Sequence, residues 1–205
     1  MEEKPKSEEI ACSWARSSAL LQQYHDTEWG IPVHDDRKMF EYLSLECLQC
    51  GLSWLLMLKK RAIFQKSFSN FDYDKVANYG ENDVERILST AEMIRSERKI
   101  RAIIHNARCY QEIRARYGSF CDYLWSYSEG KTILYKNHEE GNFPVSNELS
   151  DKISKDLNRQ GFKYVGTITM YSHLQACGII NDHAKTCPCY QKIVTHYPTT
   201  VKVGD

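Results

Sequence analysis

The chain has 205 residues, of which 42% are hydrophobic and 12% aromatic, and its 27 basic and 27 acidic residues give a formal net charge of zero. This composition supplies a core and so excludes a disordered chain. It also excludes a supercharged nucleic-acid coat, so any surface for a polyanion must be a local patch. No apolar run approaches the ~20 residues that span a bilayer, and the N-terminus does not resemble a signal peptide. We therefore expect a cytoplasmic protein, and a monomer.

Three parts are expected along the chain. Residues 1–9 form a flexible arm rich in Glu and Lys, residues 10–190 form one compact domain, and residues 191–205 form a tail without clear periodicity. Neither a Ser- or Gly-rich linker nor an internal repeat interrupts the domain. One domain is also what a chain of this length usually forms.

Helix signals dominate the first part of the domain. Asp35 and Asp36 are candidate N-caps for a helix whose apolar residues recur at helical spacing. Ser53 is a candidate cap for the next helix. Asn82 and Glu85 have the spacing of a capping box, which predicts a further short helix.

The most regular helical pattern begins at Ile100, where apolar residues recur at i, i+3, i+4 and i+7, and Gly118 stops it. Ser119 can cap a short helix directly afterwards. Ser146 can cap another helix, which Gly161 ends.

The end of the domain adds one more helix and one loop. Residues 168–177 are expected to be helical, and residues 132–144 are expected to form a long polar loop with a little extended structure. Alternating runs typical of strands are few. The predicted fold class is therefore all-α.

Eight cysteines in a chain without an export signal indicate buried thiols, metal ligands or redox groups, because structural disulfides are rare in a reducing cytosol. Cys47 and Cys50 form a C-x-x-C pair in an apolar, helix-like context. Without a following βαβ pattern, burial in the core is favoured over a redox role for this pair.

Two Cys–His pairs lie at opposite ends of the domain. Cys12 and His25 are 13 residues apart, whereas His183 and Cys187 are four apart, one helical turn or a compact loop. Thiolates and imidazoles prefer Zn²⁺ to Mg²⁺ or Ca²⁺, and four protein ligands would make a closed, structural site. From spacing alone, ordinary cysteines and solvent-facing histidines remain an alternative, and Cys189 competes with Cys187 as a ligand.

Glu46 is the most informative carboxylate, because its sequence neighbours are apolar and burial would require a cationic or hydrogen-bonding partner. Tyr24, Trp54, Trp14 and Trp29 could supply ring faces near it. Aromatic walls with one acid at the end suit a planar, positively charged heterocycle. The alternative is that these rings belong to the core and Glu46 pairs with a lysine.

Residues 95–116 carry seven basic residues against two acidic ones. Arg95, Arg98 and Lys99 at the start of this stretch could contact DNA phosphates, and the beginning of a helix there would add backbone N–H donors. A solvated helix face explains the same pattern equally well.

Seven ordered motifs run from Cys12 to Tyr190. They are C-S-W at 12–14, Y-H-D-T-E-W-G at 24–30, L-E-C-L-Q-C-G-L-S-W at 45–54, L-K-K-R at 58–61, K-I-R-A-I-I-H-N-A-R at 99–108, G-F-K-Y-V-G-T at 161–167 and Q-A-C-G-I-I-N-D-H at 175–183. With this set in this order, the chain resembles the 3-methyladenine DNA glycosylase I family of the helix-hairpin-helix glycosylase superfamily over nearly the whole domain.

The resemblance implies a helix-hairpin-helix fold and base excision repair. The reaction would hydrolyse the N-glycosidic bond of 3-methyladenine in alkylated double-stranded DNA, releasing the free base and leaving an abasic site. The resemblance also implies a structural zinc ion that joins the N- and C-terminal segments. Its ligands would be Cys12, His25, His183 and Cys187.

The same resemblance places Glu46 at the base-recognition site, where it is the candidate catalytic residue. Tyr24 and Trp54 would be its aromatic partners, with Trp14 and Trp29 close by. The family lacks the catalytic aspartate that is usual in the superfamily, so no general base is assigned.

The chain departs from the family pattern in three places. Leu21 replaces an aromatic residue, which removes one candidate wall of the pocket. The hairpin at 91–98 lacks the glycine often found there, and Glu92 and Glu97 would weaken its contact with a phosphate. The C-x-x-C pair replaces small residues.

Two other classes of function remain open. One is a catalytically inactive module that binds DNA or senses lesions. The other is a zinc-stabilised protein that binds a small cationic heterocycle and no nucleic acid.

Overall fold

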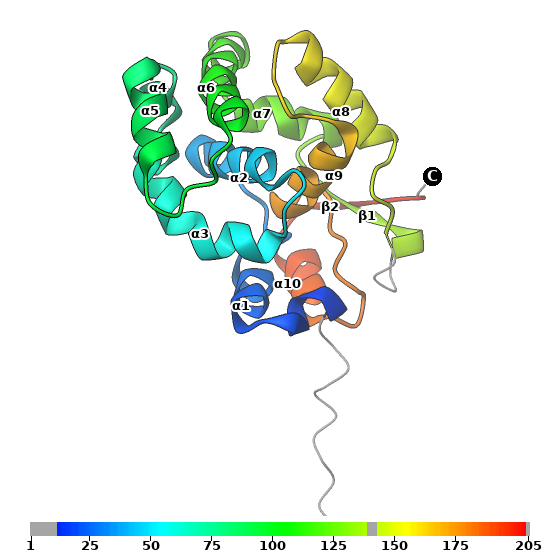
Figure 1. The fold of residues 1–205 in the computed structure, drawn as a ribbon. Coiled ribbons are helices and arrows are strands. Elements are labelled where there is room, and N and C mark those ends of the chain that lie inside the picture. The colour runs from blue at the N-terminus through cyan, green and yellow to red at the C-terminus, as the bar shows by residue number, and fades with distance from the viewer. Residues whose placement is uncertain (1–11, 139–142, 204–205) are drawn as a thin grey trace, which may run out of the picture.

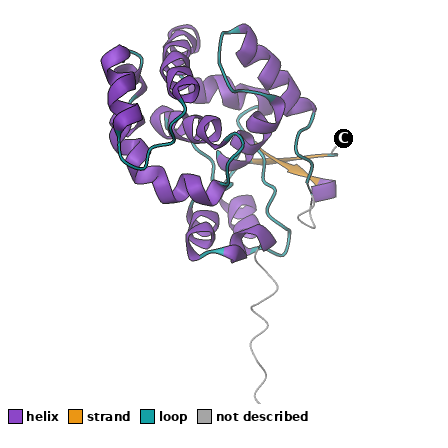
Figure 2. Ribbon diagram, in the orientation of Figure 1, coloured by secondary structure: helices purple, strands orange, loops and turns teal. Residues whose placement is uncertain are grey.

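The computed structural model describes residues 12–138 and 143–203, so the predicted N-terminal arm lies outside the described residues. Most of the chain is helical (Figure 2), as the sequence predicts. The α-helices are α1 (Ala19–Thr27), α2 (Asp36–Gln49), α3 (Trp54–Ser67), α4 (Tyr73–Val76), α5 (Glu81–Ser89), α6 (Glu97–Tyr117), α7 (Phe120–Trp125), α8 (Glu148–Arg159), α9 (Thr167–Ala176) and α10 (Pro188–His196). The short 3-10 helices are η1 (Ser13–Ser17), η2 (Ser69–Phe71), η3 (Ser126–Ser128) and η4 (Lys136–His138).

Three predicted N-caps are confirmed by their hydrogen bonds. The Asp35 carboxylate accepts from the third residue of α2 at 2.7 Å, and the Ser53 hydroxyl accepts from α3 at 3.3 Å. The Ser119 hydroxyl does the same for α7 at 3.1 Å. Each cap satisfies an N–H group that has no partner within its helix.

Two other predicted caps are wrong by one or two residues. In α5 the capping contact runs from the N–H of Gly80 to the Asp83 carboxylate, at 3.1 Å. In α8 the cap is Asn147, not Ser146, because the Asn147 side chain accepts from the N–H of Ser150 at 2.9 Å. Adjacent polar residues offer alternative caps, and packing of the helix decides between them.

Helix α2 occupies the centre of the molecule and packs against α9, α6 and α3 (Figure 1). Every residue from Met39 to Leu48 is buried. A helix that is surrounded on all sides buries its polar positions together with its apolar ones. The fold therefore carries the Glu46 side chain away from bulk water.

The structure contains a small sheet, of which the sequence predicted only a little extended structure within residues 132–144. Strand β1 (Thr132–Tyr135) lies in the predicted loop and pairs in parallel with β2 (Thr199–Lys202), with Thr132 opposite Thr199. The predicted tail therefore contains the end of α10 and all of β2. Both strands have four residues, too few to show alternation, and their pairing joins segments far apart in sequence.

The two ends of the domain meet. Helices η1 and α1 lie beside α10 (Figure 1), and the histidine and cysteine side chains of these segments are in contact. A close chain crossing supports this arrangement: a Cβ at Gly178 would lie 2.5 Å from the backbone nitrogen of Pro32. Only glycine fits at such a crossing. Among the described residues, helices are too short or too polar to cross a membrane.

His173 is an unusual member of the core. It lies in α9, is completely buried, and neither ring nitrogen has a hydrogen-bond partner among the described residues. Burial lowers its pKa from 6.5 to about 3, because the charged imidazolium would lose its hydration.

Stability should therefore fall in acid in a way that His173 controls. As the pH drops below 6.5, the His173 side chain becomes protonated in the unfolded chain, whereas in the folded protein it stays neutral down to about pH 3. This difference removes ~1.4 kcal/mol of stability per pH unit within that window and none above it. Denaturant unfolding between pH 7 and pH 4.5 should show a shallower loss for His173→Phe than for the wild type, whereas the exposed control His196→Phe should follow the wild type. Parallel curves for wild type and His173→Phe would contradict this account.

Candidate active site and metal centre

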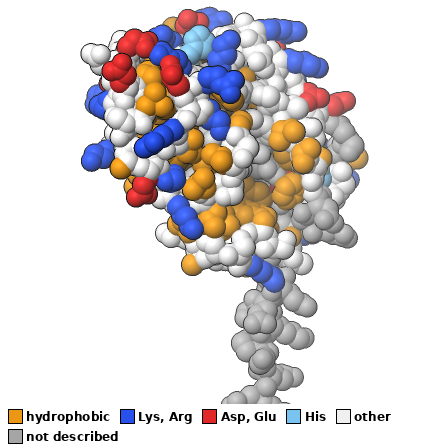
Figure 3. Space-filling view, in the orientation of Figure 1, with side chains coloured by type: hydrophobic (Ala, Val, Ile, Leu, Met, Phe, Trp, Pro, Cys, Tyr) orange, Lys and Arg blue, Asp and Glu red, His pale blue; other side chains and the backbone are white. Residues whose placement is uncertain are grey.

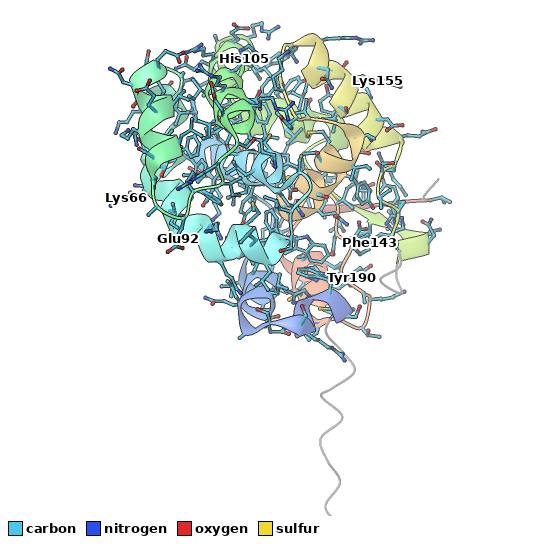
Figure 4. All side chains as sticks on the ribbon, in the orientation of Figure 1. Lys66, Glu92, His105, Phe143, Lys155 and Tyr190 are labelled. Carbon is cyan, nitrogen blue, oxygen red and sulfur yellow. The ribbon has the colours of Figure 1, made fainter. Side chains whose placement is uncertain are left out.

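A cavity of about 310 Å³ opens between α1, α2, α3 and α9. Its walls are aromatic, and its carboxyl, amide and aliphatic hydroxyl groups come from α2 and α9. The lining residues are Trp14, Tyr24, Trp29, Glu46, Gln49, Trp54, Phe143, Ser172 and Gln175. Phe143, labelled in Figure 4, belongs to the segment that follows β1 and η4. The structure thus brings together all five residues that the sequence singles out for recognition of a charged heterocycle.

The aromatic rings form a continuous wall. The ring centroids of Tyr24 and Trp54 are 5.3 Å apart at an interplanar angle of 53°, and those of Trp14 and Trp29 are 5.0 Å apart at 78°. Trp14 and Tyr24 join the two pairs at 6.5 Å. Tilted and edge contacts of this kind are the favoured geometry for aromatic pairs. They fix the rings in place before any ligand enters.

Glu46 is the only carboxylate in this lining. Its residue is 4% exposed, and no hydrogen bond or ion pair involves its carboxylate within the described part of the chain. Burial raises its pKa to about 8, since the ionised form is poorly solvated. A carboxyl group held in this way favours a ligand that brings its own positive charge or hydrogen-bond donors.

Other polar atoms of the pocket are also available to a ligand. The Trp54 Nε1–H group is buried and has no partner among the described residues. Tyr24 is 3% exposed, and burial raises the pKa of its hydroxyl group, which therefore stays protonated as a donor. Gln175 donates from Nε2 to Asp182 at 2.7 Å, which fixes the orientation of its amide.

The sequence analysis missed four lining residues. Gln49 lies three residues after Glu46, and Gln175 lies three residues after Ser172, so each pair shares a helix face. The sequence contains this spacing, but the spacing indicates residues of a cavity only when the helix that faces them is known. Phe143 had no local signal. Leu21, where an aromatic wall was expected, is buried in the core and does not line the cavity.

An ion-pair network ties together the helices that carry the aromatic wall. Arg61 of α3 donates two bonds of 2.8 Å to Glu28, directly after α1, and one of 2.8 Å to Glu41 of α2. Burial acts to raise the pKa of Glu28, but hydrogen bonds and charge from Arg61 and Lys38 outweigh it and lower the pKa to about 2. The network fixes α1, with Tyr24, against α3.

Four side chains from the two ends of the domain form a buried cluster with metal-ligand geometry. His25 Nε2 lies 3.1 Å from His183 Nδ1, and Cys187 Sγ lies 3.6 Å from the first nitrogen and 3.8 Å from the second. Cys12 Sγ lies 3.7 Å from His183 Nδ1. A tetrahedral ion with ligands about 2.0–2.3 Å away holds its donor atoms about 3.3–3.8 Å apart. The cluster therefore fits one metal ion.

The outer ring nitrogens support the same conclusion. His25 Nδ1 donates to Asp26 at 2.7 Å, and His183 Nε2 donates to the backbone oxygen of Trp29 at 3.0 Å. In neutral histidines the inner nitrogens then face each other with lone pairs, an arrangement that a cation between them stabilises. Such outward bonds are the usual support of metal-ligating histidines.

Cys189 is not part of this cluster. It is half-buried, and its sulfur lies 3.9 Å from the backbone oxygen of His25. Hydrogen bonds from Cys12 and Cys189 lower the pKa of Cys187, which favours the thiolate form that binds metals. Cys187 completes the four-residue set because its sulfur faces both inner ring nitrogens, whereas Cys189 groups only with His25 and Asp26. All eight cysteines are free thiols, including the C-x-x-C pair.

The three basic residues predicted to contact DNA have different surroundings. Arg95 and Arg98 are exposed at the start of α6. Lys99 is 9% exposed, and its ammonium group donates to the backbone oxygens of Leu48 and Cys50, both at 2.6 Å. The prediction for Lys99 is therefore corrected. Its charge caps the C-terminus of α2, where carbonyl groups lack partners.

The hairpin between α5 and α6, where the sequence lacks the expected glycine, contains a residue in the left-handed backbone conformation. Glu92 has φ +62°, a conformation that glycine adopts freely and other residues adopt at a cost of about 1–2 kcal/mol. Lys60 holds it by donating to the Glu92 backbone oxygen at 2.6 Å. The hairpin is thus formed without the glycine that its family pattern contains.

Comparison with known proteins identifies relatives over most of the chain. The sequence pattern of a family described as methyladenine glycosylase matches residues 14–190. DNA-3-methyladenine glycosylase 1 of Escherichia coli is 43% identical over 179 residues, 87% of this chain and 96% of the relative. DNA-3-methyladenine glycosylase of Haemophilus influenzae is 35% identical over 178 residues, 87% of this chain and 96% of the relative.

A solved structure shares the fold. It is the crystal structure of a 3-methyladenine DNA glycosylase I, with one tyrosine replaced by phenylalanine, in complex with 3-methyladenine. The TM-score is 0.82 at 33% sequence identity, and the match covers 87% of this chain and 96% of that one.

The ion-pair network allows a direct test of how the wall is held. Arg61→Met should lower the free energy of unfolding by ~2 kcal/mol, because it leaves the buried Glu41 and the half-buried Glu28 with Lys38 as their only cationic partner among the described residues. Adding Glu28→Gln and Glu41→Gln to this variant should recover much of that loss. The surface control Arg159→Met should cost less than ~0.5 kcal/mol in denaturant unfolding. An Arg61→Met variant as stable as the surface control would refute a structural role for the network.

Proposed function

The chain belongs to the methyladenine glycosylase family, and we propose that it hydrolyses the N-glycosidic bond of 3-methyladenine in alkylated double-stranded DNA. The free base leaves and an abasic site remains. The observation that carries this proposal is the Glu46 carboxylate, buried among aromatic rings without a partner in the described protein. Base release from methylated duplex DNA, followed by chromatography of the released 3-methyladenine, tests it directly.

The chemistry needs little help from the protein. Methylation at N3 gives the base a positive charge, so it leaves readily when the bond between N9 and the sugar C1′ breaks and the electron pair moves to the base. A water oxygen then bonds to C1′ and loses a proton to solvent. The target nucleotide must first leave the base stack, which costs a few kcal/mol and less for a damaged base.

The pocket residues have distinct roles in this reaction. Trp54 and Tyr24 stack on the extruded base, with Trp14 and Trp29 completing the wall. Glu46 accepts hydrogen bonds from the charged base and favours it over neutral adenine. As the bond breaks, positive charge moves from the base to the sugar. Glu46 therefore contributes more to selection of the base than to the rate of cleavage.

The Cys–His cluster suits zinc, because two thiolates and two imidazoles match its preferred donors. Cys12, His25, His183 and Cys187 would hold the ion and leave no open position. A zinc ion there would crosslink the N- and C-terminal segments of the domain and would not enter the reaction. The donor distances and the outward hydrogen bonds of both histidines support this assignment.

Helices α5 and α6, with the turn between them, supply the helix-hairpin-helix element of the fold. Arg95 and Arg98 are the proposed DNA contacts there. The N-cap residue of α6, Ser96, makes no side-chain capping bond, which leaves N–H groups of the first turn for a phosphate. The negative charge of Glu92 repels the phosphate and weakens this contact. A protein that binds the duplex without releasing the base would instead be a lesion-binding module.

A cytoplasmic location and a monomeric state are also proposed. The eight free thiols support the first, because such thiols persist in a reducing compartment. The domain is proposed at 10–190, and the pairing of β2 with β1 attaches residues 199–202 of the tail to it.

Glu46→Gln should reduce discrimination between methylated and normal adenine. A neutral amide of the same shape loses the charge-assisted interaction, worth about 1.5–3 kcal/mol, so the preference should fall ~10- to 100-fold. Competition binding with the permanently charged 3,9-dimethyladeninium and the neutral 9-methyladenine measures it, with the exposed variant Glu112→Gln as the control for charge. Undiminished discrimination in Glu46→Gln would refute the role assigned to this residue.

Metal analysis of the purified protein should give about one equivalent of zinc. His183→Ala should lose most of it and melt more than ~5 °C lower, the shift expected for a loss of about 2 kcal/mol in a chain of this size. The exposed control His196→Ala should keep both. Normal zinc content and melting temperature in His183→Ala would reject the site.

A further inference from the structure

A second hollow lies on the surface, between the first turns of α6 and the loop that precedes α9. It encloses about 520 Å³. Its lining residues are Arg98, Arg101, Ala102, His105, Lys163 and Tyr164. None of them lines the aromatic pocket. We call this feature the α6 groove.

The α6 groove contains two cations without partners. Arg98 and Lys163 are exposed, and no hydrogen bond or ion pair involves either side chain within the described residues. Arg101 differs, because it donates to both Glu81 oxygens at 2.7 and 2.6 Å and to Glu97 at 2.7 Å. The positive charge available to a ligand therefore comes from Arg98 and Lys163.

The loop that presents Lys163 is held rigidly against α6. The Asn106 amide accepts from the backbone N–H of Lys163 at 2.8 Å and donates to its backbone oxygen at 2.9 Å. His105 contacts the backbone oxygen of Gly161 through Nε2 at 2.9 Å. Next to Lys163, Tyr164 has φ +57°, a left-handed conformation that these fixed contacts maintain. The two cations are thus presented from rigid backbone.

The α6 groove adjoins the aromatic pocket through α2. Cys47, the neighbour of Glu46, has its sulfur 3.7 Å from the backbone oxygens of Lys163 and Tyr164. Figure 3 shows Lys and Arg side chains, with Asp and Glu side chains among them, around a histidine near the top of this face, in the region where Figure 4 labels His105. Apolar side chains lie below them in the same view. A strand whose base enters the pocket can therefore pass near this charge.

We propose that the α6 groove binds the phosphodiester backbone of the duplex, with Arg98 and Lys163 each neutralising one phosphate. This inference rests on the proposed function, because DNA is the partner it requires. Arginine and lysine contacts to phosphates position a protein on DNA without reading its sequence. The Lys163 contact lies outside the hairpin, so it extends the DNA-binding surface to the loop at 161–166.

The salt dependence of duplex binding tests this assignment. Each phosphate that the protein neutralises contributes about 0.9 to the slope of log K against log salt concentration. Lys163→Ala and Arg98→Ala should each reduce that slope by ~0.9 and weaken binding ~10-fold at 0.1 M salt. The ligand is a duplex carrying a tetrahydrofuran abasic-site analogue, titrated between 50 and 200 mM salt.

Two controls complete the experiment. Lys66→Ala removes an exposed positive charge from the end of α3, at the edge of the molecule away from His105 (Figure 4), and should keep the wild-type slope. Lys163→Arg should restore the slope, because it restores the charge. Binding of free 3-methyladenine, followed by tryptophan fluorescence, should be equal in wild type and Lys163→Ala.

Wild-type slopes in both Lys163→Ala and Arg98→Ala would overturn the proposal for the α6 groove. Loss of free-base binding in Lys163→Ala would also overturn it, since the residue would then act on the pocket. A wild-type protein that binds the duplex but releases no base would refute the proposed enzyme activity. In that case the variant slopes would still decide whether the α6 groove binds DNA.

Discussion

The structure depends on one buried carboxyl group. Glu46 lies on α2, a helix enclosed by the rest of the fold, so its side chain is separated from bulk water. Burial of an unpaired acid destabilises a protein, and the pKa of about 8 expresses that cost. A cationic ligand removes this cost, because it supplies the positive charge that the buried carboxylate lacks. We propose that the feature that weakens the empty protein also gives it a preference for an alkylated base.

Rigid surroundings make this arrangement possible. Trp29 stacks on His25 with ring centroids 6.1 Å apart and meets His183 edge-on at 4.5 Å, and Trp14 lies 5.6 Å from His25. The Cys–His cluster therefore also supports the aromatic wall from behind. The ion pairs of Arg61 support the other side of the aromatic wall, which Tyr24 and Trp54 form. A site held by such supports does not collapse onto its own acid.

Residue type and local context marked out the candidates for the site, and the resemblance to the glycosylase family decided between a functional site and the alternatives of core rings and ordinary cysteines. Glu46 is conspicuous among apolar neighbours, and the Cys–His pairs are conspicuous by type. Charge alone could not distinguish Lys99, which caps α2, from Lys163, which is free on the surface. That difference depends on which backbone atoms lie nearby after folding. The parallel pairing of β1 with β2 was hidden for the same reason, since the partners are distant in sequence.

The most direct test of the central claim is calorimetric binding of two small bases to the protein between pH 7 and pH 9. The first is 3,9-dimethyladeninium, which is permanently charged, and the second is neutral 9-methyladenine. Our account predicts tighter binding of the cation, with a preference that grows as Glu46 ionises around pH 8. Equal affinities, or a preference that does not change with pH, would contradict the role given to this carboxyl group.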